Sequence, residues 1–414
     1  MRRNLYISIF AVFLLMGCVQ EENDIFEDSP AERINKAVMA YQELLIKDER
    51  TWVMEYFTNT SGPGNIILMK FNASGAVNMS MQNAVSENKL LKDTSLYEML
   101  SDYGPVLTFN TFNKVLHAFS NPENPDGYGL MGDYEFIITK TSGDTLYMKG
   151  KKYKSDILMY PLKNVVDENA YLQQINTLYN QIFTEESPQL TLVTGTNNYY
   201  LNGGYTGVMD IARGSFVLNA PFIMKENGIR FQNVIEVESL KLQEFTLKPD
   251  KSAFVSVSNP AVMIMGPSDL SSFILNSVIE WKLNQGGGRL GTAINALNQQ
   301  IITTYAATDL KISLRYFSTR RTFVLTINFM SGGFKTEGNI DLTTTSAGNN
   351  KMKIVAKSTG DAKGVQMLTE LTALTPFLTE LSSTFNMSTE VLLNPEKIRL
   401  ANQSDAGQWV EIVR

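Results

Sequence analysis

The chain contains one histidine and one cysteine, so few kinds of catalytic or metal centre can be built from it. A structural zinc site needs about four Cys or His ligands, and a Cys nucleophile needs a free thiol and a His base. A disulfide framework needs paired cysteines. His117 has apolar neighbours in a segment typical of a short helix, which favours a hydrogen-bonded structural role. We therefore expect no metal site, no cofactor and no catalytic residues.

Acidic residues are plentiful, and two carboxyl groups about 5 to 9 Å apart are the basis of glycosidic hydrolysis. Asp126, Asp133 and Glu135 flank a Pro/Gly-rich loop, whereas Asp210 and Glu226 fall among expected strands. We interpret each of them as a solvated surface acid. A glycan hydrolase based on carboxylates remains an alternative function.

Residues 286–291 read G-G-G-R-L-G and match the G-x-G-x-x-G pattern of dinucleotide-binding loops. The pattern has that meaning only after a strand and before a helix. Because residues 271–283 have a helical pattern, we predict that the glycines connect two helices and bind no dinucleotide.

A loop at 194–205 combines tyrosines with amide side chains. Flat rings can stack on sugars and amides can bond hydroxyl groups, and such loops are frequent at binding surfaces. The alternative is that two of the tyrosines end a strand and cover the core. The candidate ligand-binding residues are Tyr199, Tyr200, Tyr205, Asn197 and Asn198.

The N-terminus has the pattern of an exported protein. Two arginines precede a twelve-residue apolar stretch at 5–16, too short to cross about 30 Å of hydrocarbon but suited to a signal peptide. The sequence Leu15-Met16-Gly17-Cys18 resembles a lipobox, so we predict that residues 1–17 are a lipoprotein signal peptide and that Cys18 carries lipid. An ordinary secretory signal with a chance cysteine is the alternative.

The composition is that of a globular protein, with 43% hydrophobic and 19% charged residues, and 414 residues suggest two domains, or one domain with a large elaboration. The net charge is −6. Nucleic acid needs a basic footprint, which the sequence lacks, so we expect no nucleic-acid partner.

The first half predicts a helix followed by hairpins. Residues 18–28 read as an acidic tether, and Ser29-Pro30-Ala31-Glu32 is typical of a capped helix start. Period-two alternation on both sides of the turn at 72–75 predicts a hairpin, and 134–149 predicts another. We therefore expect a module over 29–165 with a helix against an antiparallel sheet.

The second half, 166–414, repeats the order of helix and then strands. A helix is predicted at 167–183. Further strands are predicted at 206–219, 222–235, 310–317, 322–329, 334–343 and 351–357, and helices at 269–283, 290–304 and 366–384. The predicted fold class is α+β, rich in antiparallel sheet, with two packed modules that each place helices against a meander sheet.

Several segments together carry a family resemblance. They are Phe26–Arg33, Tyr103–Asn113, Val115–His117, Gly132–Ile138, Met148–Lys152 and Trp409–Val413. The chain resembles the Bacteroidetes lipoprotein family catalogued as domain of unknown function 4302, most closely over 26–160. That family has no established reaction or catalytic residue, so the resemblance implies only Cys18 as an anchor. Its members tend to accompany outer-membrane nutrient-import systems, and the acidic tether resembles those of surface-exported lipoproteins.

We therefore expect a lipoprotein of the outer membrane, facing the cell surface, that acts as a non-catalytic binding or accessory component of glycan or peptide uptake. Its expected partners are the membrane, through the lipid, and an import complex. A third reading is a lipocalin-like carrier with an apolar cavity. The thioethers that suggest it are those of Met79, Met81, Met131, Met148 and Met159.

Overall fold

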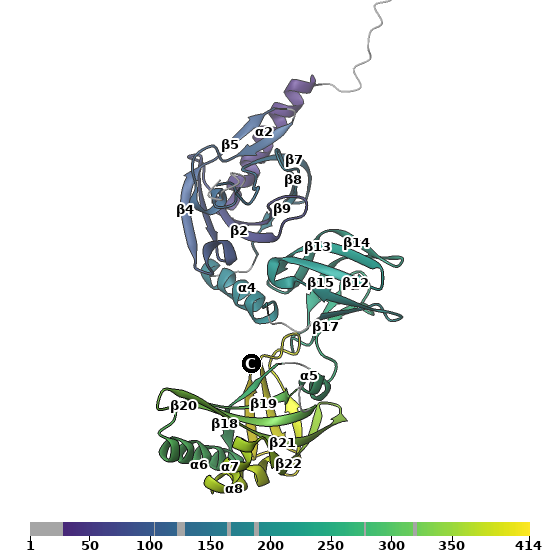
Figure 1. Cartoon of the computed structure of the whole chain (residues 1–414). Helices are drawn as coiled ribbons and strands as arrows, with labels where there is room; N and C mark the ends of the chain where they lie inside the picture. Colours follow the sequence, from purple (N-terminus) through teal and green to yellow (C-terminus); the bar gives the residue numbers. More distant parts are fainter. Residues whose placement is uncertain are drawn as a thin grey trace, which may run out of the picture.

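The computed structural model of the chain is shown in Figure 1. It describes residues 28–102, 104–121, 129–163, 167–185, 190–276, 279–317 and 321–414. The expected signal peptide, Cys18 and Asp126 lie outside these ranges, and so does the tether apart from Asp28. Within them, no helix is long and apolar enough to cross a membrane.

The described chain begins with α2 (Pro30–Ile46), which starts as its sequence predicts. The backbone N–H of Glu32 donates to the Ser29 hydroxyl at 3.3 Å, and the Ser29 N–H donates to the Glu32 carboxylate at 3.0 Å. This reciprocal pair satisfies two N–H groups that a helix start leaves unbonded. Leu45, near the other end of α2, is fully buried.

The first module (residues 28–163) is a nine-stranded antiparallel sheet with α2 and short helices packed on it. Its strands are β1 (Thr51–Phe57), β2 (Gly64–Phe71), β3 (Ala76–Met81), β4 (Leu91–Leu96), β5 (Glu98–Ser101), β6 (Pro105–Thr108), β7 (Glu135–Ser142), β8 (Thr145–Gly150) and β9 (Asp156–Pro161). The short helices are η1 (Lys47–Glu49), η2 (Ala84–Ser86) and α3 (Lys114–His117).

The sheet of the first module curls back on itself. Its strand order is β4-β3-β2-β1-β9-β8-β7-β6-β5, so β4 and β5 are the two edges. These edges are consecutive in sequence and are separated only by Tyr97, because β4 ends at Leu96 and β5 begins at Glu98. One bent stretch of chain therefore pairs with β3 before the bend and with β6 after it.

β1 is covered on both faces. Trp52, Met54 and Tyr56 lie in the core of the first module. Val53 and Phe57 point the other way, into the core of the next part of the chain. Successive side chains of a strand point to opposite faces, so the burial of six of the seven residues of β1 means that the sheet is covered on both sides here.

The second part (residues 167–265) consists of α4 (Glu168–Ile182) and a closed eight-stranded barrel, here called barrel 1. The barrel strands are β10 (Leu190–Val193), β11 (Asn198–Asn202), β12 (Val208–Arg213), β13 (Phe216–Lys225), β14 (Gly228–Val237), β15 (Leu240–Leu247), β16 (Ala253–Ser256) and β17 (Met263–Met265), with η3 (Gly204–Thr206) after β11. Each strand pairs with its sequence neighbour, and β17 pairs with β10 to close the ring.

The inside of barrel 1 is filled with large apolar side chains. Phe222 and Phe254 are at most 1% exposed, and Phe183 at the end of α4 packs against both, with ring centroids 5.0 and 6.3 Å away. Close-packed interiors of this kind leave little room for a ligand. A carrier with an apolar cavity therefore gains no support from barrel 1.

The third part (residues 270–414) is barrel 2, also closed and eight-stranded. Its strands are β18 (Trp281–Gly287), β19 (Thr308–Phe317), β20 (Thr322–Ser331), β21 (Phe334–Gly348), β22 (Lys351–Gly360), β23 (Thr384–Ser388), β24 (Lys397–Asn402) and β25 (Trp409–Val413). Its helices are α5 (Leu270–Asn276), α6 (Gly288–Tyr305), α7 (Ala362–Glu370) and α8 (Leu374–Leu381). Figure 1 shows α6, α7 and α8 together at one end of the barrel and α5 at the other.

The prediction of a helix over 269–283 is wrong at its end. Helix α5 stops at Asn276, and β18 begins at Trp281 and runs to Gly287, directly before α6. The glycine motif therefore does lie between a strand and a helix, contrary to the helix–helix connection expected from sequence. Its neighbour β19 is antiparallel, however, so the parallel unit of a dinucleotide fold is missing at this place.

The glycines of the motif allow neighbouring parts of the chain to pack closely against them. A Cβ on Gly291 would collide with the backbone of Gly286, and a Cβ on Gly287 would collide with the ring of Trp409. At the start of α6 the Leu290 N–H donates to the Gln408 amide oxygen at 3.0 Å, so a side chain already occupies part of this helix N-terminus.

The expectation of a sheet-rich, antiparallel chain is confirmed, but α+β with two helix-on-meander modules describes it only roughly. Residues 166–414 hold two separate closed barrels rather than one open sheet. The helix that begins at Ser29-Pro30, the helix at 167–183, the hairpin around the turn at 72–75 and the hairpin over 134–149 lie where the sequence predicts them.

Candidate functional site

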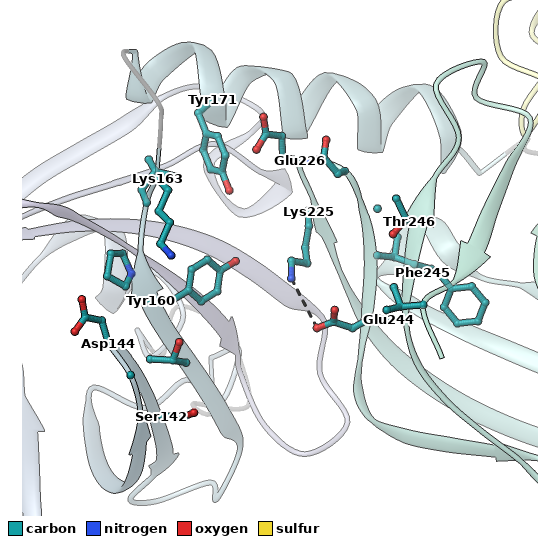
Figure 2. A pocket seen from close by; sticks show the side chains of 18 residues that line it. Ser142, Asp144, Tyr160, Lys163, Tyr171, Lys225, Glu226, Glu244, Phe245 and Thr246 are labelled. Atoms are coloured by element: carbon teal, nitrogen blue, oxygen red, sulfur yellow. Dashed lines mark ion pairs between the residues drawn. The ribbon is translucent and has the colours of Figure 1, made fainter. Parts of the chain in front are cut away.

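A cleft of about 870 Å³ lies where the first module meets barrel 1 (Figure 2). The first module contributes the β7–β8 turn and the end of β9, and α4 contributes Tyr171. Barrel 1 contributes the β13–β14 turn and β15. Volumes of this size are typical of sites for small molecules or short polymers, and such sites are common between domains.

Side chains of both charges line the cleft. Lys163 and Lys225 supply amines, and Asp144, Glu226 and Glu244 supply carboxylates. The Lys225 amine lies 3.9 Å from the Glu244 carboxylate, the pair marked in Figure 2. The cleft therefore presents donors and acceptors of opposite charge within one space.

Lys225 is held by a buried carboxylate behind the cleft. Glu55 of β1 is fully buried, and the Lys225 amine lies 3.2 Å from its Oε1. The Tyr160 hydroxyl donates to the same oxygen at 3.0 Å, and the Arg230 Nε donates to the other oxygen. Arg230 is 5% exposed, so this is an ion pair removed from water. We call Glu55, Arg230, Lys225 and Tyr160 the joint cluster.

Strand alternation brings the joint cluster together. Glu55 shares the outer face of β1 with Val53 and Phe57, which contact barrel 1. In β14, Ile229 and Phe231 belong to the buried apolar core shared with barrel 1, so Arg230 between them points outward, toward β1.

The pKa values within the joint cluster follow from its burial. Burial alone would raise the pKa of Glu55, but the charges of Arg230 and Lys225 outweigh it and leave that pKa below 4.5. Burial and the Glu55 charge raise the pKa of Tyr160 far above its usual range, and burial raises the pKa of Tyr171 to about 12. Both tyrosines therefore keep their protons at neutral pH and can donate hydrogen bonds.

Asp144, one of the cleft carboxylates, does not have the raised pKa of a general acid. A hydrogen bond from Arg50 lowers the pKa of Asp144, whereas an acid catalyst needs a raised one. Burial raises the pKa of Asp133, but this residue is not in the lining of the cleft, and its carboxylate accepts the backbone N–H groups of Lys152 and Tyr153 at 2.8 Å. The hydrolase alternative finds no support in this cleft.

The five candidate ligand-binding residues are not brought to one place. Asn197 and Tyr199 donate to the same oxygen of the Glu238 carboxylate at 2.6 and 3.1 Å. Tyr199 is only 5% exposed and belongs to the barrel core, which is the covering role that the alternative reading gave it. These hydrogen bonds link the start of β11 to the turn between β14 and β15.

The other three candidates face solvent. Asn198 and Tyr200 lie on the outer face of β11, and Tyr200 is 54% exposed. Tyr205 of η3 is 47% exposed and contributes to hollows other than the cleft.

His117 lies between two aromatic rings. Its centroid is 5.3 Å from those of Phe112 and Tyr134, and its Nδ1 accepts the Asn113 N–H at 3.1 Å. Burial lowers the pKa of His117, so the ring is neutral at pH 7. This geometry agrees with a structural role. Over the described residues, no three or more His, Cys, Asp or Glu side chains gather as metal ligands would.

The joint cluster was not predicted from the sequence, although its signal is present there. Glu55 is the only charged residue in the strand T-W-V-M-E-Y-F, and Arg230 stands alone in G-I-R-F. A single charge in an otherwise apolar strand is expected to have a buried partner of opposite charge. The identity of that partner, 175 residues away, is not encoded locally.

The fold and the cleft together define a class: a three-part antiparallel β protein with two closed barrels and an open, charged cleft between its first two parts. The family model described as Domain of unknown function (DUF4302) matches residues 22–249, more than half of the chain. The chain belongs to this family, and the match covers the first module and barrel 1 through β15.

Other comparisons add little. No curated protein matches the chain. Kievitone hydratase from Nectria haematococca is 11% identical with a TM-score of 0.12, covering 88% of this chain and 89% of the hydratase. The binding domain of botulinum neurotoxin DC, solved in complex with rat synaptotagmin II, is 10% identical with a TM-score of 0.10, covering 89% and 75%. At these scores neither likeness carries an argument.

Proposed function

We propose that this protein is a non-catalytic binding protein that captures a short polar ligand, in the first place a peptide, in the cleft between the first module and barrel 1. The observation that carries the proposal is the lining of the cleft, where amines and carboxylates face one space next to two tyrosines.

A peptide fits this lining by its chemistry. Its termini and side chains carry both charges, and its amides need donors and acceptors. Lys163 can meet a carboxylate and Glu226 an amine, while the Tyr171 hydroxyl stays protonated as a donor. A neutral glycan can donate hydroxyl groups to the cleft carboxylates but has no anionic group for the Lys163 amine, so it would use less of this lining than a peptide.

The second part of the proposal concerns the location of the protein in the cell. The predicted lipidation of Cys18 would hold the protein at the outer membrane, with the acidic tether favouring the cell surface. From there a binding protein can deliver ligand to an import complex. Incorporation of radiolabelled palmitate in cells, and its loss in Cys18→Ala, tests the anchor separately from the cleft.

Titration calorimetry of the mature protein with synthetic di- to hexapeptides tests the cleft. We expect Lys163→Met or Glu226→Gln to weaken peptide binding at least tenfold, the usual effect of losing a charged contact. Lys353→Met is the matched control, because Lys353 is an exposed lysine of β22 in barrel 2. Equal weakening by all three variants, or no peptide binding at all, contradicts the proposal.

A further inference from the structure

The outer face of β11 presents an aromatic ring between two amides. Leu201 and Tyr199 point inward and are at most 5% exposed, so Asn198, Tyr200 and Asn202 share the outward face. Residues two apart on a strand are about 7 Å from each other, which is close to the width of a sugar ring with its hydroxyl groups.

The strands beside β11 leave the ring of Tyr200 uncovered. Tyr200 lies opposite Thr191 of β10 on one side and Ala212 of β12 on the other. Both neighbours have short side chains, and the next residue across, Val217 of β13, is 64% exposed. The side chain of Tyr200 is therefore not covered by these neighbours and is 54% exposed to solvent.

The next row toward the end of the barrel is polar. Asn202 lies opposite Asp210, and Asp210 lies opposite Asn219. The Asn219 amide donates to Asp210 Oδ1 at 2.5 Å, which fixes the carboxylate on the surface. Amide and carboxylate groups in such an arrangement can bond the hydroxyl groups of a ligand.

This polar row borders a hollow of about 390 Å³ at the end of barrel 1. Asn202 and Asp210 line it together with Tyr205 and Glu185. The Tyr179 hydroxyl donates to the Tyr205 carbonyl at 3.0 Å, and Gly203 precedes η3 with φ 77°, so the backbone that carries the second tyrosine is held in place.

The charge of the hollow selects the ligand. Its described lining includes two carboxylates and no Lys, Arg or His side chain. An anionic ligand would be repelled there, whereas hydroxyl groups can donate to both carboxylates. The described lining has no cationic side chain to pair with the carboxylate of a peptide.

We propose that the outer face of β11 and the adjoining hollow form a binding site for a neutral saccharide. Tyr200 and Tyr205 stack on the apolar faces of its pyranose rings, and Asn202 and Asp210 bond its hydroxyl groups. The site shares no residue with the cleft, so the two ligands bind independently.

Affinity electrophoresis of the full mature protein tests this site, with xylan, dextran, laminarin or galactomannan in the gel. We expect at least one of these neutral polysaccharides to retard the protein, and Tyr200→Ala and Tyr205→Ala each to weaken that binding at least fivefold. Polygalacturonate, which is anionic, is expected to cause no retardation.

Tyr316→Ala is the matched control, because Tyr316 is a 43% exposed tyrosine of β19 in barrel 2. It and the cleft variant Lys163→Met should be retarded like the parent protein. Because Tyr200 faces solvent, its replacement should leave the far-ultraviolet circular dichroism unchanged. Retardation by none of the four polysaccharides, or retardation unchanged in both tyrosine variants, overturns the proposal.

Discussion

The two joints of the molecule are built differently. At the first joint, between the first module and barrel 1, the fully buried Glu55 meets Arg230 and Lys225 behind an open cleft. At the second joint, between the barrels, the fully buried Leu393 of the β23–β24 connection packs into the core of barrel 1. Its N–H donates to the Lys251 carbonyl at 3.3 Å.

The difference shows how one chain can both fix its parts and leave a site between them. Apolar surfaces gain free energy by excluding water, so a joint made by Leu393 closes. Burying a charged side chain costs free energy unless a partner of opposite charge lies beside it. The two parts therefore exclude water at the first joint only where such a partner is present. Beyond the joint cluster, the cleft remains open with charges at its wall.

The largest expected effect is at the first joint. Arg230→Met leaves the Glu55 carboxylate buried without its main partner, and we expect the free energy of unfolding to fall by about 3–5 kcal/mol. Chemical denaturation followed by tryptophan fluorescence measures this, since Trp52 lies in the same strand as Glu55. The double variant Glu55→Leu with Arg230→Met should recover much of the loss. A single variant as stable as the parent would show that the cluster does not hold the joint.

The same cluster predicts a dependence of stability on pH. The pKa of Glu55 is below 4.5 in the folded protein, so the stability contributed by its ionised form is complete above pH 4.5 and is lost as the pH falls through the lowered value. The difference in unfolding free energy between the parent and Glu55→Gln should therefore narrow below pH 4.5. A difference that is constant between pH 3 and 7 is incompatible with this assignment.

A somewhat smaller effect is expected at the second joint. Leu393→Ala removes apolar contacts and leaves a cavity, which should cost about 2–4 kcal/mol in the same denaturation experiment. Leu392→Ala is the matched control on the same connection, because Leu392 is only partly buried and should cost less. Similar losses in both variants would argue against an apolar plug at this joint.

The smallest effect is expected at the rim of the cleft. Glu244 is 47% exposed, and its carboxylate lies 3.9 Å from the Lys225 amine. Exposed pairs contribute little, so Glu244→Gln should change the unfolding free energy by about 0.5 kcal/mol or less. A loss approaching that of Arg230→Met would mean that the rim belongs to the buried cluster.

Local signals predicted the local structure well. The capping box at Ser29 and the glycine-containing turns need only neighbouring residues, so they could be located from sequence. The error at Trp281 has the opposite origin. Its segment has a helical pattern, but pairing with β19 and β25 makes it a strand, and those partners lie 31 or more residues away.

The candidate binding loop shows the same division. Its residue types were correctly singled out as polar and aromatic, but strand alternation divides them between two surfaces. Tyr199 enters the barrel core and Tyr200 faces solvent. The side chains of a strand alternate between its two faces, but which of them point inward is known only when the pairing register of the strand is known.

The sequence by itself determined the start of α2, the hairpin turns, the antiparallel character of the sheets and the single-cysteine, single-histidine limit on chemistry, because these depend on residue type and short spacing. Only the tertiary structure decided that the strands close into barrels, that Glu55 meets Arg230, and that a charged cleft lies between the first two parts. Those features depend on contacts between residues far apart in the chain, such as Val193 with Met263 at the closure of barrel 1 or Glu55 with Arg230, where the free energy of burial, and not local preference, selects the partner.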